Sequence, residues 1–196
     1  MLDPSQPRRF ITAQEHLEAS FALGRTIYDS GFRPSFIVGL WRGGSTVGIA
    51  VQECFEYLGV ATDHIAIRTS GGPRTHDNDR PIRVHGTQYL LETLNREDRL
   101  LLVDDVFSTG RSVTAAVARL NARLRNNMPA EVRTAAVWYR DGEAQDDRRP
   151  DFFYQQTRDW LVLPYELSSV PQSELIAERQ ELEPLFKRVT ATRQSS

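Results

Sequence analysis

The chain has 196 residues, a length that suits one domain with at most a small appendage. Its 24 basic and 26 acidic residues give a net charge of −2, which argues against nucleic acid as a partner, because general nucleic-acid binders carry a basic excess. All basic residues except Lys187 are arginines, so we expect guanidinium groups to hold any bound anion. Cys54 is the single cysteine, which excludes an internal disulfide. Because no apolar run approaches the ~18 residues of a membrane span and no secretory signal begins the chain, we expect a cytoplasmic protein without a membrane partner.

The first part of the chain predicts a helix, a strand and a second helix. Thr12 and Glu15 have the spacing of a capping box, which predicts a helix start. The expected apolar face of this helix consists of Leu17, Phe21, Gly24 and Tyr28. Residues 36–40 form a short apolar run that predicts a buried strand. After the loop at residues 41–44, apolar residues return with helical spacing up to Gly59: Val47, Ala50, Val51, Cys54, Phe55 and Leu58.

Residues 64–139 continue the alternation of strand and helix. We expect strands at residues 64–68, 82–85, 100–103 and 134–139, and a helix near residues 88–94. A further helix carries on one face Val113, Ala116, Val117, Leu120 and Leu124. The run at 100–103 is apolar throughout, which is typical of a parallel strand covered on both faces. Residues 69–81 are polar and have no period, and a loop of this length inside a compact domain is usually functional or disordered. The pattern predicts an α/β fold with a doubly wound, mostly parallel sheet.

Two regions follow from this pattern. Residues 1–140 are expected to form the core domain, which includes the N-terminal helix and the loop at 69–81. Residues 141–196 break the alternation, because they are first charged and then aromatic and apolar, with Pro150, Pro164 and Pro171. We expect this second region to form a small hood, a last helix at about 173–186 and a polar tail.

The segment 101–112 carries the clearest chemical signal. Asp104 and Asp105 follow a buried strand, and the turn Ser108-Thr109-Gly110-Arg111-Ser112 leads into a helix. In open α/β sheets ligands bind beyond the carboxyl ends of the strands. The amides and hydroxyls of such a turn, at the positive end of a helix, suit a phosphate group. Two adjacent carboxylates can accept hydrogen bonds from a ribose diol or coordinate magnesium. The segment therefore predicts a site for a ribose 5-phosphate.

This segment closely resembles the 5-phosphoribosyl-1-pyrophosphate (PRPP) signature of type I phosphoribosyltransferases. The resemblance implies that Asp104, Asp105 and residues 108–112 bind PRPP. It also implies that residues 39–44 form a pyrophosphate loop, in which Arg42 and Gly43 contact the anion and the Trp41–Arg42 peptide bond is cis. The loop at 69–81 matches the mobile catalytic loop of the family in position, with Ser70, Gly71, Gly72 and Arg74 as candidates for contacting pyrophosphate.

Residues 150–153 and 159–166 resemble the hood of 6-oxopurine phosphoribosyltransferases, above all the shorter microbial xanthine–guanine and hypoxanthine enzymes. The resemblance implies that Trp160 stacks on the purine and that the backbone of Leu161 hydrogen-bonds the base edge. It implies a Mg²⁺ cofactor bound by Asp104, Asp105 and Glu166. Arg140 stands where the family places a lysine that donates to the 6-oxo group, which leaves the base preference open.

The implied function is magnesium-dependent transfer of the 5-phosphoribosyl group from PRPP to hypoxanthine, guanine or xanthine, which yields a nucleoside 5′-monophosphate and pyrophosphate. Asp104, Asp105 and Arg42 would be the catalytic residues of a homo-oligomer, a dimer or a tetramer. Ser108 departs from the 6-oxopurine pattern, in which an Asp near N7 acts as acid and base. Either Asp105 or a water takes this role, or the base is a different one. The alternatives are a regulator that senses PRPP or a nucleotide, and a transferase for adenine or a pyrimidine.

Overall fold

The computed structural model describes residues 8–70, 81–142 and 148–186. The chain divides into two compact units, one of residues 17–158 and one that joins residues 2–16 to residues 159–196. No helix in the described part of the chain is long and apolar enough to cross a membrane.

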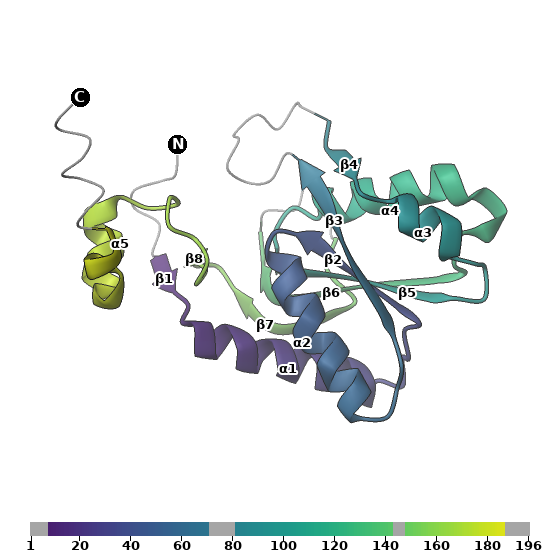
Figure 1. The fold of residues 1–196 in the computed structure, drawn as a ribbon, viewed down its shortest axis with the longest axis horizontal. Helices are drawn as coiled ribbons and strands as arrows, with labels where there is room; N and C mark the ends of the chain where they lie inside the picture. The colour runs from purple at the N-terminus through teal and green to yellow at the C-terminus, as the bar shows by residue number, and fades with distance from the viewer. Residues whose placement is uncertain (1–7, 71–80, 143–147, 187–196) are drawn as a thin grey trace. The chain divides into compact units, whose positions relative to one another are not determined.

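The larger unit is built on a six-stranded sheet with the order β4-β3-β2-β5-β6-β7 (Figure 1). The five parallel strands are β2 (Phe36–Trp41), β3 (Asp63–Ser70), β5 (Arg99–Phe107), β6 (Glu131–Arg140) and β7 (Phe152–Thr157). The short edge strand β4 (Arg83–His85) is antiparallel to β3. This arrangement confirms the predicted doubly wound, mostly parallel α/β fold.

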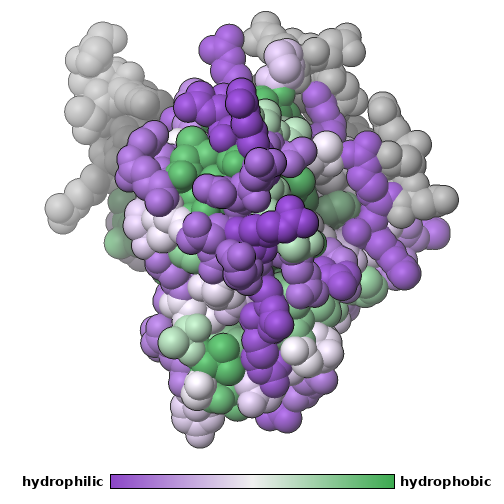
Figure 2. Space-filling model, turned by 90° about the vertical axis from the view of Figure 1, so that its right-hand side faces the viewer, coloured by the Kyte–Doolittle hydropathy of each residue, from purple (hydrophilic) through white to green (hydrophobic). Residues whose placement is uncertain are grey.

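Helices cover both faces of this sheet. Figure 1 shows α1 (Ala13–Asp29) and α2 (Gly43–Tyr57) on one face, and α3 (Gln88–Thr93) and α4 (Arg111–Leu124) on the other. The core under α3 and α4 includes Val38, Leu40, Leu102 and Leu120. In Figure 2 the visible face is mostly hydrophilic, with apolar side chains in small separate areas, as is usual for a protein surface.

The predicted apolar face of α1 is partly wrong. The start is as expected, since the Glu15 N–H donates to Thr12 Oγ1 at 3.0 Å. However, Leu17 is 46% exposed and Phe21 is 41% exposed. The buried stripe consists of His16, Ala19, Ser20, Leu23, Gly24 and Ile27, so Gly24 of the predicted face is buried as expected. This stripe has regular helical spacing but contains a histidine and a serine, so a search for apolar residues selected the neighbouring positions instead.

Strand β5 is longer than the apolar run that predicted it. It continues past Val103 to Phe107, because its pairing with β6 persists from Asp104↔Ala136 to Phe107↔Tyr139. Asp104 and Asp105 therefore belong to the strand.

The larger unit extends past residue 140 to Arg158. Strand β7 pairs in parallel with β6, from Ala135↔Phe152 to Arg140↔Thr157, and so extends the main sheet. The smaller unit begins again at Asp159 and contains a pair of parallel strands, β1 (Arg8–Phe10) and β8 (Trp160–Val162). Strand β1 is too short to produce a sequence pattern.

The smaller unit also contains α5 (Gln172–Glu178) and a 3₁₀ turn, η2 (Gln180–Leu182). Its core joins Val162, Val170 and Leu175. The last helix, expected at about 173–186, is interrupted at Arg179, whose backbone (φ −134°, ψ 69°) leaves the helical region.

Candidate functional site

The candidate site lies at the point where the strand order reverses. From β2 the chain passes through α2 to β3 on one side, and later returns to β5 on the other side of β2. The carboxyl ends of β2 and β5 are therefore neighbours, and the segments that follow them are residues 42–44 and residues 108–112. A crevice at such a point is where ligands bind in open α/β sheets.

Two glycines pack the start of α2 tightly against the sheet. A Cβ atom on Gly39 would lie 2.6 Å from the carbonyl oxygen of Gly44, and one on Gly44 would lie 2.3 Å from the carbonyl oxygen of Val103. The Gly44 N–H also donates to the Asp104 carboxyl group. The resemblance implied a contact of Gly43 with pyrophosphate, but the sequence did not predict this contact of Gly44 with Asp104.

The loop predicted to bind pyrophosphate has the cis peptide bond that the resemblance implied. The Trp41–Arg42 peptide bond is cis. Arg42 is exposed and directly precedes α2, while Gly43 is buried in the first turn of this helix. The structure thus brings Arg42 and Gly43 to the same edge of the sheet as Asp104 and Asp105.

The two aspartates form a compact, hydrogen-bonded pair. The Asp105 N–H donates to Asp104 Oδ1 at 3.0 Å, and the Val106 N–H donates to Asp105 Oδ1 at 2.7 Å. Burial, the charge of Asp105 and a side-chain hydrogen bond with Asp105 raise the pKa of Asp104 well above its ordinary value. A cation or a set of hydroxyl donors placed against the pair would favour the charged form of Asp104.

This carboxylate pair fits a magnesium ion. Mg²⁺ is commonly bound by one or two carboxylates, with phosphate oxygens and waters as the other ligands. Within the described ranges, no group of three or more His, Cys, Asp and Glu side chains could form a complete protein cage. The pair therefore suits an ion that arrives with a phosphorylated substrate.

The turn before α4 is shaped by Gly110. Its φ is 68°, and a Cβ atom there would lie 2.7 Å from the ring of Phe107, so both the backbone angle and the space require glycine. As the N-cap, Gly110 offers no side-chain acceptor to the first amides of α4. The Arg111 N–H donates to Thr109 Oγ1 at 3.5 Å. The start of α4, beside the partly buried Ser108, Thr109, Arg111 and Ser112, is the positive end of the helix dipole and suits an anion.

The predicted base-binding residues lie in different units. Arg140 ends β6 in the larger unit and is 6% exposed. Trp160 and Leu161 belong to β8, and Glu166 belongs to the turn after it, in the smaller unit. The predicted site residues of the larger unit thus lie at the carboxyl ends of its parallel strands. Trp160, Leu161 and Glu166, the last of them a predicted metal ligand, belong to the smaller unit.

The backbone of Leu161 faces an edge of β8 that β1 does not occupy. The Val162 carbonyl accepts a hydrogen bond from the Ile11 N–H at 3.0 Å, so the backbone groups of Val162 face β1. Successive residues of a strand direct their backbone groups to opposite edges. The N–H and C=O of Leu161 therefore point to the other edge, where no strand pairs among the described residues.

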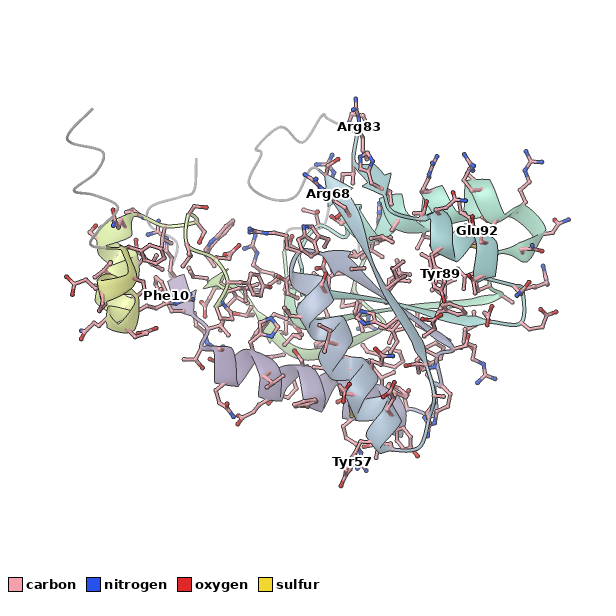
Figure 3. All side chains as sticks on the ribbon, in the orientation of Figure 1. Phe10, Tyr57, Arg68, Arg83, Tyr89 and Glu92 are labelled. Atoms are coloured by element: carbon pink, nitrogen blue, oxygen red, sulfur yellow. The ribbon has the colours of Figure 1, made fainter. Side chains whose placement is uncertain are left out.

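The loop predicted at 69–81 is described only at its ends. Ser70 ends β3, while Gly71, Gly72 and Arg74 lie outside the described residues. Figure 3 shows Arg68 and Arg83 on the two strands that flank this loop. Arg68, which the sequence did not single out, is in register with Trp41 at the carboxyl end of β2.

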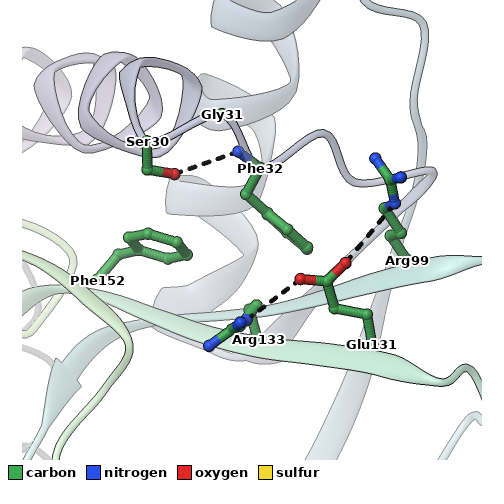
Figure 4. Close-up of a pocket in the computed structure, with 7 residues that line it drawn as sticks. All are labelled: Ser30, Gly31, Phe32, Arg99, Glu131, Arg133 and Phe152. Atoms are coloured by element: carbon green, nitrogen blue, oxygen red, sulfur yellow. Dashed lines mark hydrogen bonds and ion pairs between the residues drawn. The ribbon is translucent and has the colours of Figure 1, made fainter.

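A pocket of about 440 Å³ lies at the opposite edge of the sheet, where β5 and β6 begin (Figure 4). The charged side chains that line it pair with one another, because Glu131 lies 3.6 Å from Arg99 and 3.5 Å from Arg133. The aromatic part of the lining is Phe32 and Phe152. This pocket contains none of the predicted site residues.

Comparisons with known proteins agree with this geometry. The phosphoribosyl transferase domain family matches residues 14–169. Among curated proteins nothing matches the chain. Similar solved structures include a purine phosphoribosyltransferase from Pyrococcus horikoshii, with 19% identity over 84% of this chain and 97% of that one and a TM-score of 0.60.

Two further structures are similar over nearly their full length. Xanthine-guanine-hypoxanthine phosphoribosyltransferase from Helicobacter pylori has 14% identity over 87% of this chain and 99% of that one, with a TM-score of 0.61. Hypoxanthine phosphoribosyl transferase from Trypanosoma cruzi has 13% identity over 92% of this chain and 100% of that one, with a TM-score of 0.64. At these identities the likeness establishes a common fold.

Proposed function

The chain belongs to the phosphoribosyl transferase domain family, and we propose that it transfers the 5-phosphoribosyl group of PRPP to a purine base, with hypoxanthine, guanine or xanthine as acceptor. The observation that carries this proposal is the cluster at the reversal of strand order. There Gly44 holds the pyrophosphate loop against Asp104, next to the glycine turn that opens α4.

Each part of the cluster suits one part of PRPP. The amides and hydroxyls of residues 108–112 would bind the 5-phosphate, and Asp104 and Asp105 would accept hydrogen bonds from the ribose hydroxyls. Arg42 and Gly43 would bind the pyrophosphate. Mg²⁺ would be held by Asp104 and Asp105, with Glu166 as a further ligand, and it would neutralise charge on the pyrophosphate.

The reaction would be a displacement at C1 of the ribose. A base nitrogen forms the new bond to C1 as the C1–O bond to pyrophosphate breaks, through a transition state with oxocarbenium character, by analogy with glycoside cleavage. Arg42 stabilises the negative charge that develops on the leaving pyrophosphate. Ser108 cannot take up the N7 proton of the base near pH 7, so Asp105 or a water would accept it.

The proposed base site combines the aromatic ring of Trp160 with hydrogen-bonding groups of Leu161 and Arg140. Trp160 would stack on the purine. The N–H and C=O of the buried Leu161, on the strand edge away from β1, would read the base edge, and the Arg140 guanidinium would donate to the 6-oxo group. Donors at this position favour a 6-oxopurine over adenine, because the amino group of adenine is itself a donor.

The test measures the release of pyrophosphate from PRPP in the presence of magnesium, with hypoxanthine, guanine, xanthine or adenine as the acceptor base. We expect turnover with at least one 6-oxopurine, and a loss of about 100-fold or more when Asp104→Asn and Asp105→Asn are combined. Asp29→Asn, an exposed change on α1, is the matched control and should leave turnover unchanged. Near-normal turnover of the double variant would overturn the assignment of the site.

A second candidate is a regulator that binds PRPP or a nucleotide without useful turnover. Ser108 favours it, because the acid–base carboxylate of 6-oxopurine enzymes is missing at this position. Binding of PRPP or a purine nucleotide without turnover of any of the four bases would establish the regulator. Turnover with adenine alone, or with a pyrimidine, would establish the third alternative.

A further inference from the structure

Arg179 is a buried cation at the centre of the smaller unit. It follows the last residue of α5 and is 8% exposed. Buried guanidinium groups need several acceptors, because the loss of hydration is costly unless hydrogen bonds replace it. Arg179 finds these acceptors in backbone carbonyls of two distant parts of the chain.

The guanidinium group of Arg179 donates to four carbonyl oxygens. Nη1 donates to Pro164 at 2.8 Å. Nη2 lies 2.9 Å from the oxygen of Leu163, 3.3 Å from that of Val162 and 3.4 Å from that of Ile11. The guanidinium carbon also lies 5.8 Å from the ring centre of Phe10, a β1 residue labelled in Figure 3. A planar group with a fixed fork of donors can serve these acceptors together, whereas a lysine ammonium is a single point charge.

These carbonyls belong to the segment that carries the proposed base contacts. Val162 is the last residue of β8, directly after Trp160 and Leu161. Its carbonyl accepts from both Ile11 and Arg179, so Arg179 secures the pairing that turns Leu161 toward the open edge. The Leu163 carbonyl accepts from both Arg179 and the Glu166 N–H, the latter at 2.9 Å, so Arg179 also secures the turn that presents Glu166.

We propose that Arg179 is the positioning residue of the base site: by binding the carbonyls of residues 162–164, it holds the Leu161 backbone and the Trp160 ring in the conformation that receives the purine. This inference rests on the proposed function. It assigns to the C-terminal part of the chain a role in substrate selection, although Arg179 itself does not contact the base.

A second arginine of the same unit provides a matched control. Arg8 forms an ion pair with Glu174 and so connects β1 to α5, but it donates to none of the carbonyls of residues 162–164 in the described contacts. If the connection between strand and helix were all that mattered, loss of either arginine would have the same effect on the base site. We expect the loss of Arg179 to affect the base site and the loss of Arg8 to leave it unchanged.

The experiment compares Arg179→Lys, Arg179→Gly and Arg8→Met with the wild-type protein in steady-state kinetics with PRPP and the preferred base. For both Arg179 variants we expect the KM for the base to rise about ten-fold or more, while the KM for PRPP stays within about two-fold. Adding guanidinium far below denaturing concentrations should lower the base KM of Arg179→Gly, because the free ion can occupy the vacated donor position. Arg8→Met should keep both constants.

The outcomes separate this inference from the proposed function. An inactive wild-type protein would contradict the proposed function and this inference with it. An active wild-type protein whose Arg179 variants show equal rises of both KM values, or no change, would overturn the role of Arg179 alone. If Arg179→Gly fails to fold, Arg179→Lys decides: a selective rise of the base KM supports the proposal, and unchanged kinetics contradict it.

Discussion

At the residue scale, the site depends on groups whose properties differ from those of the free amino acids. Asp104 is a carboxyl group with a raised pKa, because it is partly buried beside a second carboxyl group. Gly44 and Gly110 are positions where a single added carbon would meet backbone or ring atoms at less than 3 Å. Each of these properties leads to a measurable consequence.

Asp104→Asn should stabilise the ligand-free protein near neutral pH. The pKa of Asp104 is raised from its ordinary value of 3.8. This group therefore contributes stability that is fully present below pH 3.8 and is lost as the pH rises through its folded-state pKa. Asparagine keeps the acceptor for the Asp105 N–H and carries no charge. We expect the Tm of the variant to exceed that of the wild-type protein by a difference that grows with pH above about 4. Each kcal/mol of added stability should raise Tm by about 2–4 °C. An advantage that is constant with pH would contradict the raised pKa.

Gly44→Ala should disrupt the site more than it disrupts the fold. Its Cβ would lie 2.3 Å from the Val103 carbonyl oxygen, so the start of α2 must move away from Asp104. We expect a loss of about 1–3 kcal/mol in the free energy of unfolding and loss of PRPP binding in calorimetry. Gly59→Ala, at the other end of α2, is the control, since its φ of 79° strains alanine without a clash. PRPP binding retained by Gly44→Ala would show that the contact is dispensable.

At the scale of elements, the strand order creates the site and β7 completes the sheet that carries it. The reversal between β2 and β5 brings residues 42–44 beside Asp104, although about 60 residues of sequence separate them. Strand β7 covers the outer edge of β6, the strand that ends at Arg140. Its inward aromatic side chain, Phe152, packs against Phe32 with ring centres 6.1 Å apart.

Phe152→Ala therefore tests whether β7 belongs to the larger unit. Truncation of this half-buried ring should cost about 1–3 kcal/mol in urea unfolding, less than the 3–5 kcal/mol of a fully buried phenylalanine. Tyr154→Ala on the same strand is the control, because Tyr154 is exposed, and it should cost less than about 0.5 kcal/mol. Equal costs would place β7 outside the core of the sheet.

At the scale of the whole molecule, a bound substrate should stabilise the fold. PRPP with magnesium at about 100 times its Kd should add about 2.7 kcal/mol to the free energy of unfolding. Removal of magnesium by a chelator should abolish most of the resulting Tm shift, because the Asp104–Asp105 pair would then face the pyrophosphate without a cation. An unchanged shift in the chelator would contradict the metal proposal. The expected homo-oligomer and cytoplasmic location stay predictions.

Much of the fold was predictable because its signals are local. The apolar runs of β2 and β5 and the helical spacing in α2 and α4 each lie within a short window. The buried face of α1 and the length of β5 were not predicted correctly, because His16 and Ser20 are buried and Asp104 is paired within the sheet. Strand β1 was also not predicted, because three residues are too few to show the alternation of a strand.

By itself, the sequence determined the α/β class and the PRPP-like segment at 101–112, and it predicted the pyrophosphate loop, because each depends on residue types at fixed short spacings. Only the tertiary structure decided the rest. It places the Gly44 amide on Asp104, turns the Leu161 backbone to an open strand edge and buries Arg179 among carbonyls of residues 11 and 162–164. These contacts join residues far apart in the chain, and they arise from close packing, which leaves no trace in local periodicity.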